Sequence, residues 1–117
     1  EPAGQAVGRI ETASLYKVSH GDGRALELSG FAERNGATAE CIVLVDGTRT
    51  AIGAGAPVVK RPDVEQAVGR SLCLAGWKGV ASAPKAMPVC ALALFPGEDE
   101  LRPLDGCQTV GNGPATR

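Results

Sequence analysis

The stretch ECIVLVDGT, residues 40–48, decides the fold class that we expect for this chain. Its apolar residues alternate between two faces of an extended strand, with Ile42 and Leu44 on one face and their neighbours on the other. Because both faces are apolar, the pattern favours a central strand over an edge strand. Asp46-Gly47 follows directly and is typical of a hairpin turn, whose central residues need positive φ. We therefore expect a hairpin between strands at 40–45 and 48–52.

Short runs with the same period of two recur on both sides of this hairpin. The further expected strands are 8–18, 25–31, 72–74, 77–81, 88–95 and 100–104. Turn residues separate them, including a turn at 20–23 and an Asn35-Gly36 pair. About seven short strands with such regular turn signals indicate an all-β fold, specifically an immunoglobulin-like antiparallel β-sandwich.

The size of the chain favours one domain. It has 117 residues, of which 44% are hydrophobic and 16 are glycine. That length is typical of a single core, and that hydrophobic content is too high for a disordered chain. We expect one β-sandwich domain over residues 1–110 and a loose C-terminal tail over 111–117.

One short helix is expected at residues 61–69. Asp63 is the predicted N-cap, and Gln66 stands three residues on, where it can close a capping box. Gly69 is suited to the left-handed C-terminal cap. Apolar residues at 64, 67 and 68 would form the stripe that packs on the sheet.

Four cysteines indicate the compartment. Cys41, Cys73, Cys90 and Cys107 are too far apart for a CxxC zinc or redox motif, and one histidine cannot complete a zinc site. An even number of spaced cysteines in a small chain favours two disulfides in a periplasmic or extracellular setting. Four buried free thiols are the alternative.

The expected strands also predict how the cysteines pair. Folding residues 88–95 back on residues 100–108 places Cys90 opposite Cys107, close enough for a cross-strand disulfide. This pairing leaves Cys41 and Cys73 to form the second bridge. Four cysteines allow three connectivities, so the pairing is a preference among them.

Charge and hydropathy disfavour two classes of partner. The formal net charge is −1, and no run of like charges would attract nucleic acid or an anionic membrane. The longest apolar stretch, residues 87–97, contains two prolines and is shorter than the roughly 20 residues of a membrane-spanning helix. The first residue, Glu1, is expected to follow a processing or truncation point.

No residue pattern indicates catalysis. His20 lies in an expected turn, where its neighbours rarely converge into a triad, and we expect a solvated loop histidine. Glu98, Asp99 and Glu100 are expected to form a solvated turn, at most a weak cation site. No phosphate-binding glycine motif is present. We therefore expect a protein that is not an enzyme and has no metal or cofactor.

Trp77, Lys78 and Arg61 are the candidate ligand-binding residues. An exposed tryptophan beside polar groups could stack on a sugar, with Lys78 or Arg61 donating hydrogen bonds. In a chain with 3% aromatic residues, Trp77 is also the natural anchor of the core. Arg61 could equally hold a nearby carboxylate for structural reasons.

Several short motifs, taken in order, resemble a known family. They are Gly30-Phe31-Ala32, residues 42–47 ending in Asp46-Gly47, Arg61-Pro62-Asp63-Val64, Gly76-Trp77, and the closing hairpin from Val89 to Leu104. Over residues 9–105 the chain resembles the immunoglobulin-like modules of bacterial extracytoplasmic proteins. Such modules are appended to surface enzymes and to membrane proteins that handle envelope glycans. The resemblance implies an accessory domain and assigns no catalytic residue.

The sequence thus predicts a non-catalytic extracytoplasmic accessory or interaction domain, the soluble part of a larger bacterial envelope or membrane-anchored protein. Its partner would be another protein or an envelope glycan. A carbohydrate-binding module that uses Trp77 is the rival hypothesis, and a small hydrolase or inhibitor is a weaker third.

Overall fold

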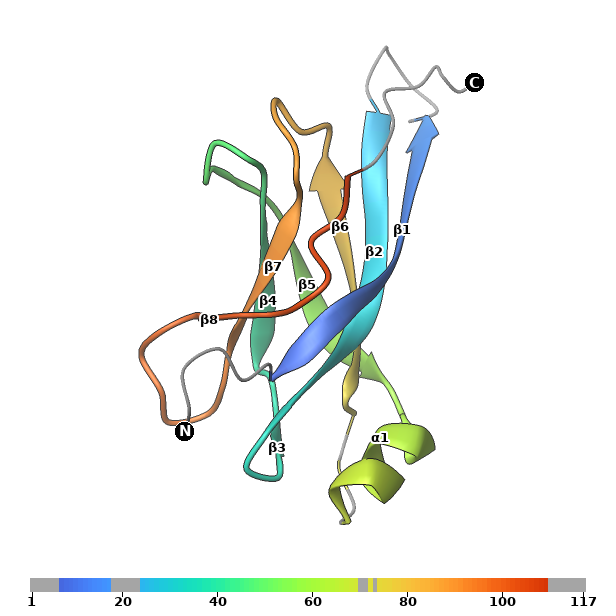
Figure 1. Cartoon of the computed structure of the whole chain (residues 1–117), viewed down its shortest axis with the longest axis vertical. Helices are drawn as coiled ribbons and strands as arrows, with labels where there is room; N and C mark the ends of the chain where they lie inside the picture. The colour runs from blue at the N-terminus through green and yellow to red at the C-terminus, as the bar shows by residue number, and fades with distance from the viewer. Residues whose placement is uncertain (1–6, 18–23, 70–71, 73, 110–117) are drawn as a thin grey trace.

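The computed structural model describes residues 7–17, 24–69, 72 and 74–109 (Figure 1). These residues form eight strands and one helix: β1 Gly8–Lys17, β2 Arg24–Arg34, β3 Ala37–Thr38, β4 Cys41–Val45, β5 Ala51–Val59, α1 Pro62–Val68, β6 Gly76–Ser82, β7 Cys90–Leu94 and β8 Arg102–Pro103. The expected turn at 20–23 with His20, Cys73, and the expected tail at 111–117 lie outside the described residues.

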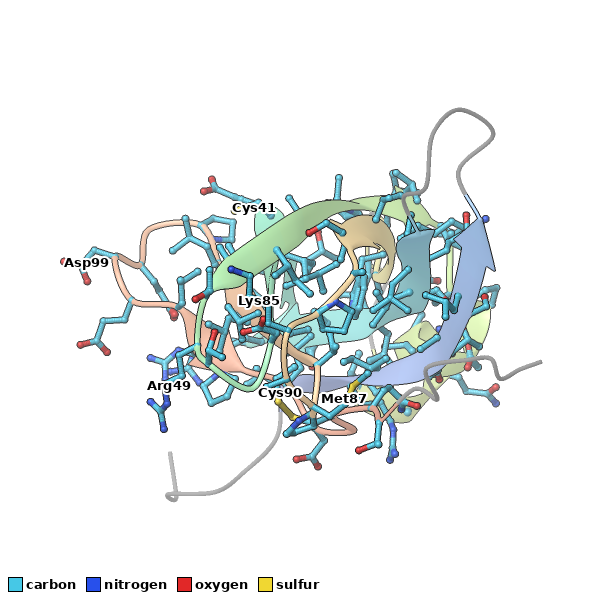
Figure 2. The ribbon with its side chains drawn as sticks, turned by 90° about the horizontal axis from the view of Figure 1, so that it is seen from above. Cys41, Arg49, Lys85, Met87, Cys90 and Asp99 are labelled. Atoms are coloured by element: carbon cyan, nitrogen blue, oxygen red, sulfur yellow. A yellow bond between two sulfur atoms is a disulfide. The ribbon has the colours of Figure 1, made fainter. Side chains whose placement is uncertain are left out.

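The described strands belong to a single antiparallel sheet that curls on itself. Their order is β1-β2-β6-β5-β4-β7-β8, and β3 pairs with β2 at one end. The two edges of the sheet meet where the Ile10 N–H donates to the Asp105 carbonyl at 2.8 Å. Figure 2 looks down the long axis and shows strands placed around enclosed side chains. The all-β antiparallel prediction is confirmed, whereas the expected pair of separate stacked sheets is replaced by one continuous curled sheet.

The core fills the concave side of this sheet. Ile42 and Leu44 are fully buried, while the residues beside them on β4 are half-buried on the outer face. This confirms the predicted alternation and the central position of β4 between β5 and β7. The main core cluster is Val7, Ile10, Leu26, Leu28, Ala32, Ala39, Ile42, Leu44, Trp77, Ala81, Val89, Ala91, Ala93, Phe95 and Leu104.

Two hairpins of the sheet have different turns. Asn35 and Gly36, a predicted turn pair, both have positive φ, at 53° and 85°, and join β2 to the short strand β3, which was not predicted. The hairpin from β4 to β5 also forms, but its turn is longer than Asp46-Gly47. Arg49 is the residue with positive φ, and the Asp46 N–H donates to the Thr50 carbonyl at 3.1 Å. The geometry is that of a three-residue loop, because the Asp46 side chain organises the backbone that follows it.

Strand β5 is much longer than expected. The sequence predicts a strand only to residue 52, because two glycines and a proline follow, yet β5 runs from Ala51 to Val59. A Cβ atom at Gly53 would lie 2.1 Å from the Val80 carbonyl oxygen of β6, and one at Gly55 would lie 2.7 Å from the Lys78 carbonyl oxygen. The glycines are therefore places where two backbones approach closely, not breaks in the strand.

The short helix packs through one residue. Val64 is buried in a small second cluster with Leu72 and Ala75, against which Phe31 packs. The other two members of the expected stripe, Ala67 and Val68, are exposed. Gly69 has φ 79° and forms the predicted C-terminal cap.

Two expected strands are shorter or missing. Neither described residue of the 72–74 segment is in a strand, because Leu72 is buried against the helix instead. The expected strand at 100–104 is reduced to Arg102–Pro103, since only two residues of β8 pair with β7.

Replacing Gly53 with alanine should destabilise the fold, because the new Cβ would overlap the β6 backbone. We expect Gly53→Ala to lower the free energy of unfolding by about 1–3 kcal/mol. The control is Ala56→Ser, an exposed change on the same strand. Equal urea midpoints for the two variants would show that β5 and β6 do not approach each other as closely at Gly53 as described.

Candidate functional site

The three predicted ligand-binding residues do not form one site. Trp77 exposes 1% of its surface and belongs to the core, so no face of its ring is free to stack on a sugar. Lys78 is the next residue in β6 and lies on the outer face, because successive strand residues point to opposite faces. Arg61 precedes α1 at one end of the molecule (Figure 1). The sugar-stacking role predicted for Trp77 is therefore wrong, and its role as a core anchor is confirmed.

Lys78 lines a shallow polar hollow on the outer face of β1, β2 and β6. Thr12, Ser14, Glu27 and Ser29 contribute its other polar groups, and its volume is about 210 Å³. The Thr12 and Ser29 hydroxyls hydrogen-bond each other. Those two hydroxyl groups are therefore already partnered.

Arg61 holds three elements together. Its guanidinium donates to both oxygens of Glu11 in β1, at 2.7 and 3.2 Å, and to both oxygens of Asp63 in α1, at 3.0 and 2.7 Å. Its Cζ lies 5.6 Å from the centroid of the Phe31 ring in β2. These contacts raise the pKa of Arg61, chiefly through the hydrogen bonds to Asp63 and then to Glu11. The residue is a structural clamp, as one of the two sequence interpretations proposed.

The predicted capping roles of Asp63 and Gln66 are wrong. The N-cap of α1 is Arg61, with no side-chain cap, and Asp63 lies inside the first turn. Its carboxylate is turned to Arg61 instead, and this hydrogen bond lowers the pKa of Asp63 to about 2. Gln66 is exposed and has no capping-box contact among the described residues. The helix instead begins at Pro62, a position where a backbone N–H would have no partner within the helix, so proline loses nothing by lacking one.

Three further ion pairs tie a loop to two strands and the start of α1 to the chain before it. Glu98 accepts from Arg34 at 2.8 Å and from Arg102 at 2.7 Å, so it is held by two cations and is not the solvated group that we expected. Lys60 pairs with Glu65 in α1 and also donates to the Leu72 carbonyl at 2.7 Å. Hydrogen bonds from Arg102 and Lys60 lower the pKa of Glu98 and Glu65, respectively.

The disulfide between Cys90 and Cys107 confirms the first predicted bridge. Their Cα atoms are 4.4 Å apart, beside the pairing of Val89 with Gln108. Closing this loop stabilises the fold by about 3 kcal/mol in the loop-entropy model. The bond ties the segment that follows β8 to the start of β7.

The second predicted bridge does not form. Cys41 is a free thiol, and Cys73 lies outside the described residues.

Asp46 is the buried carboxylate that organises the β4–β5 turn. Its exposed fraction is 3%. Oδ1 accepts from the Thr48 N–H at 2.9 Å and the Thr48 hydroxyl at 2.6 Å, and Oδ2 accepts from the Lys85 N–H at 3.0 Å. These donors stabilise the ionised form and lower the pKa of Asp46 to about 2, with the Thr48 hydroxyl as the largest cause. The side chain thereby joins the β4–β5 turn to the β6–β7 loop.

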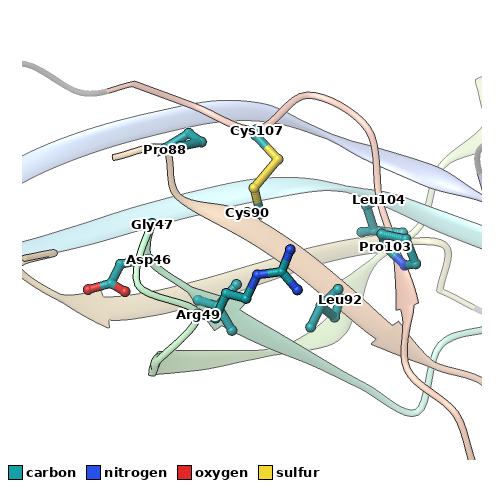
Figure 3. Close-up of a pocket in the computed structure, with 10 residues that line it drawn as sticks. Asp46, Gly47, Arg49, Pro88, Cys90, Leu92, Pro103, Leu104 and Cys107 are labelled. Carbon is teal, nitrogen blue, oxygen red and sulfur yellow. A yellow bond between two sulfur atoms is a disulfide. The ribbon is translucent and has the colours of Figure 1, made fainter. Parts of the chain in front are cut away.

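A groove of about 590 Å³ lies beside this turn, on the outer face of β4, β7 and β8 (Figure 3). Val45, Leu92, Pro103, Leu104 and the disulfide give it apolar walls. Arg49 extends over it between Cys90 and Leu92, while the Asp46 carboxylate is turned the other way. Sequence reasoning missed this groove. Its signal in the sequence was the apolar outward face of residues 45 and 92.

Within the described ranges, no group of three or more histidine, cysteine or acidic side chains could hold a metal ion. In the same ranges, no helix is long and apolar enough to cross a membrane.

No protein-family model, curated protein or solved structure matches the chain.

Replacing Arg61 should weaken the junction of β1, β2 and α1. We expect Arg61→Gln to lower the free energy of unfolding by about 1 kcal/mol. Arg61→Lys should lower it by most of the same amount, because an ammonium group cannot bind two carboxylates bidentately. Lys85→Gln is the control, because it removes one exposed cation that forms no described ion pair. An Arg61→Lys urea midpoint equal to wild type would contradict the clamp.

The Asp46 carboxylate should make stability depend on acid pH. Its pKa is depressed on folding, so its contribution is complete above the unfolded value of 3.8 and is lost as the pH falls towards about 2. Asp46→Asn should therefore lower Tm at pH 7, and the difference from wild type should shrink below pH 4. Asp99→Asn, on an exposed turn, controls for the loss of one negative charge. A constant gap in Tm between pH 7 and pH 2 would contradict this role.

Proposed function

We propose that this chain is a non-catalytic extracytoplasmic accessory or interaction domain, the soluble part of a larger bacterial envelope or membrane-anchored protein. Its partner is a protein or an envelope glycan. This role was predicted from the sequence, and the geometry of the charged residues supports it.

The supporting observation is that the carboxyl groups with a shifted pKa all serve as ionised hydrogen-bond acceptors. Asp46, Asp63, Glu65 and Glu98 all have a lowered pKa. A general acid working at neutral pH needs a raised carboxyl pKa, which keeps a proton available. Here each of these groups is an ionised acceptor that ties one segment to another. The charged side chains therefore support a scaffold rather than a reaction.

The setting is supported by the Cys90–Cys107 disulfide, because such bonds persist mainly in oxidising compartments. The net charge of −1 gives no electrostatic reason to bind nucleic acid or an anionic membrane. These features fit an exported domain that contacts its partner through surface shape rather than through strong charge.

The order of the strands supports the immunoglobulin-like part of the proposal. An immunoglobulin constant domain has strands A, B, E and D in one sheet and C, F and G in the other. Assigning β1, β2, β4, β5, β6, β7 and β8 to A through G gives the order A-B-E-D-C-F-G. In this chain the two halves are fused where β5 pairs with β4. We infer a modified immunoglobulin-like topology in which strands C and D, which belong to separate sheets in a constant domain, are paired with each other.

Trapping thiols in living cells tests the extracytoplasmic setting. Cells that express the full-length protein are quenched in acid, and free thiols are alkylated with a maleimide of high mass before or after reduction. We expect Cys90 and Cys107 to react only after reduction, because they are already paired in the cell. The Cys90→Ser/Cys107→Ser double variant identifies the bands. Alkylation of both residues without reduction would refute export.

The non-catalytic role is tested in the full-length protein. His20 is the only imidazole of the chain, so His20→Ala should leave any chemical step of the full-length protein unchanged. Loss of that step in a folded His20→Ala variant would refute the proposal, and Glu100→Gln serves as the matched control in the same assay.

A further inference from the structure

Arg49 has a conformation that its residue type does not favour. Its φ is 67°, in the left-handed region where a side chain with a Cβ atom is strained and where asparagine or glycine is usual. Asn35 is the other described non-glycine residue with positive φ, and asparagine suits that region. An arginine held in such a conformation suggests that its side chain has a use.

The Arg49 side chain has no partner within the described part of the chain, and it is exposed over the groove. The nearest carboxylate in sequence is Asp46, which also lines the groove but is turned away and satisfied by Thr48 and Lys85. Three other arginines do form described ion pairs, each with a glutamate: Arg34, Arg61 and Arg102. Arg49 therefore presents an uncompensated positive charge at the mouth of an apolar groove.

The groove offers an incoming ligand few free backbone N–H donors. The N–H groups of Gly47, Arg49 and Leu104 donate to carbonyl groups of the chain itself. Pro88 and Pro103 have no N–H to offer. An extended peptide that lay here would leave many of its own polar groups unpaired, which is costly. A hydrocarbon chain has no such groups.

We propose that the groove binds the carboxylate of a fatty-acid-like amphiphile. The guanidinium of Arg49 pairs with the carboxylate head, and the acyl chain lies along Val45, Leu92 and Pro103. A volume of about 590 Å³ is in the range of small-molecule sites, which are mostly apolar with a few placed polar groups. The arginine fork matches a carboxylate bidentately. This binding site goes beyond the accessory role and does not depend on the cellular compartment.

Decanoate, used below its critical micelle concentration, is the test ligand, and binding is followed by calorimetry and by the NMR methyl signals of the groove. We expect shifts at Val45 and Leu92, with the exposed methyl groups of Val58 and Val80 on β5 and β6 unchanged. Shortening the ligand to octanoate should weaken binding about three- to tenfold. Decanol, which keeps the chain but loses the charge, should bind at least fivefold more weakly.

Two variants of Arg49 separate binding from folding. Arg49→Gln should weaken decanoate binding about fivefold or more and abolish the preference over decanol. Arg49→Gly should lose the same affinity while raising Tm by a few degrees, because glycine accepts positive φ without strain. Lys85→Gln is the matched control: Lys85 is an exposed cation at the same end of the molecule but does not line the groove (Figure 2). It should bind decanoate like wild type.

Several outcomes would overturn the proposal. Equal affinities for decanol and decanoate, or equal losses in Arg49→Gln and Lys85→Gln, would remove Arg49 as the head-group site. Shifts that depend on protein concentration without ligand, together with a dimer mass, would assign the groove to a second copy of the chain. Displacement of decanoate by an acetylated Leu-Ala-Leu peptide at lower concentration would assign it to a peptide.

Discussion

The close approach of β5 and β6 is the constraint on which the rest of the structure depends. β5 pairs with β4 on one side and with β6 on the other, so it joins β1-β2-β6 to β4-β7-β8. Gly53 and Gly55 lie where a Cβ atom would overlap the β6 backbone. Their lack of a side chain lets the sheet curl tightly enough for its edges to meet at Ile10 and Asp105.

The curl also determines where function can reside. The concave side is filled by core side chains, with Trp77 among the largest, so it is closed to ligands. Any binding must use the outer face or the loop ends. At one loop end, Asp46 fixes the β4–β5 turn against Lys85 and the disulfide fixes the chain after β8. The apolar groove and Arg49 lie between these two fixed points, on a rigid support.

Local patterns predicted the elements that local interactions determine. Alternation in residues 40–45 placed Ile42 and Leu44 inside, and hairpin geometry placed Cys90 opposite Cys107, because both depend on neighbouring strands with short connections. Contacts between distant segments escaped prediction. Arg61 pairs with Glu11, 50 residues away, and Asp46 accepts from Lys85, 39 residues away. The glycines of β5 looked like breaks because β6, the strand that needs their small size, follows much later in the chain.

Amide hydrogen exchange tests the β5–β6 constraint most directly. Residues 53–55 pair with strands on both sides, so their amide groups are hydrogen-bonded within the sheet. If β5 is the strand that holds both halves together, these amides should exchange only through global unfolding, with the same free energy as that from urea denaturation. Exchange of residues 53–55 at rates near those of the exposed residues 99–101 would contradict the account, because the two halves would then not be joined by this strand.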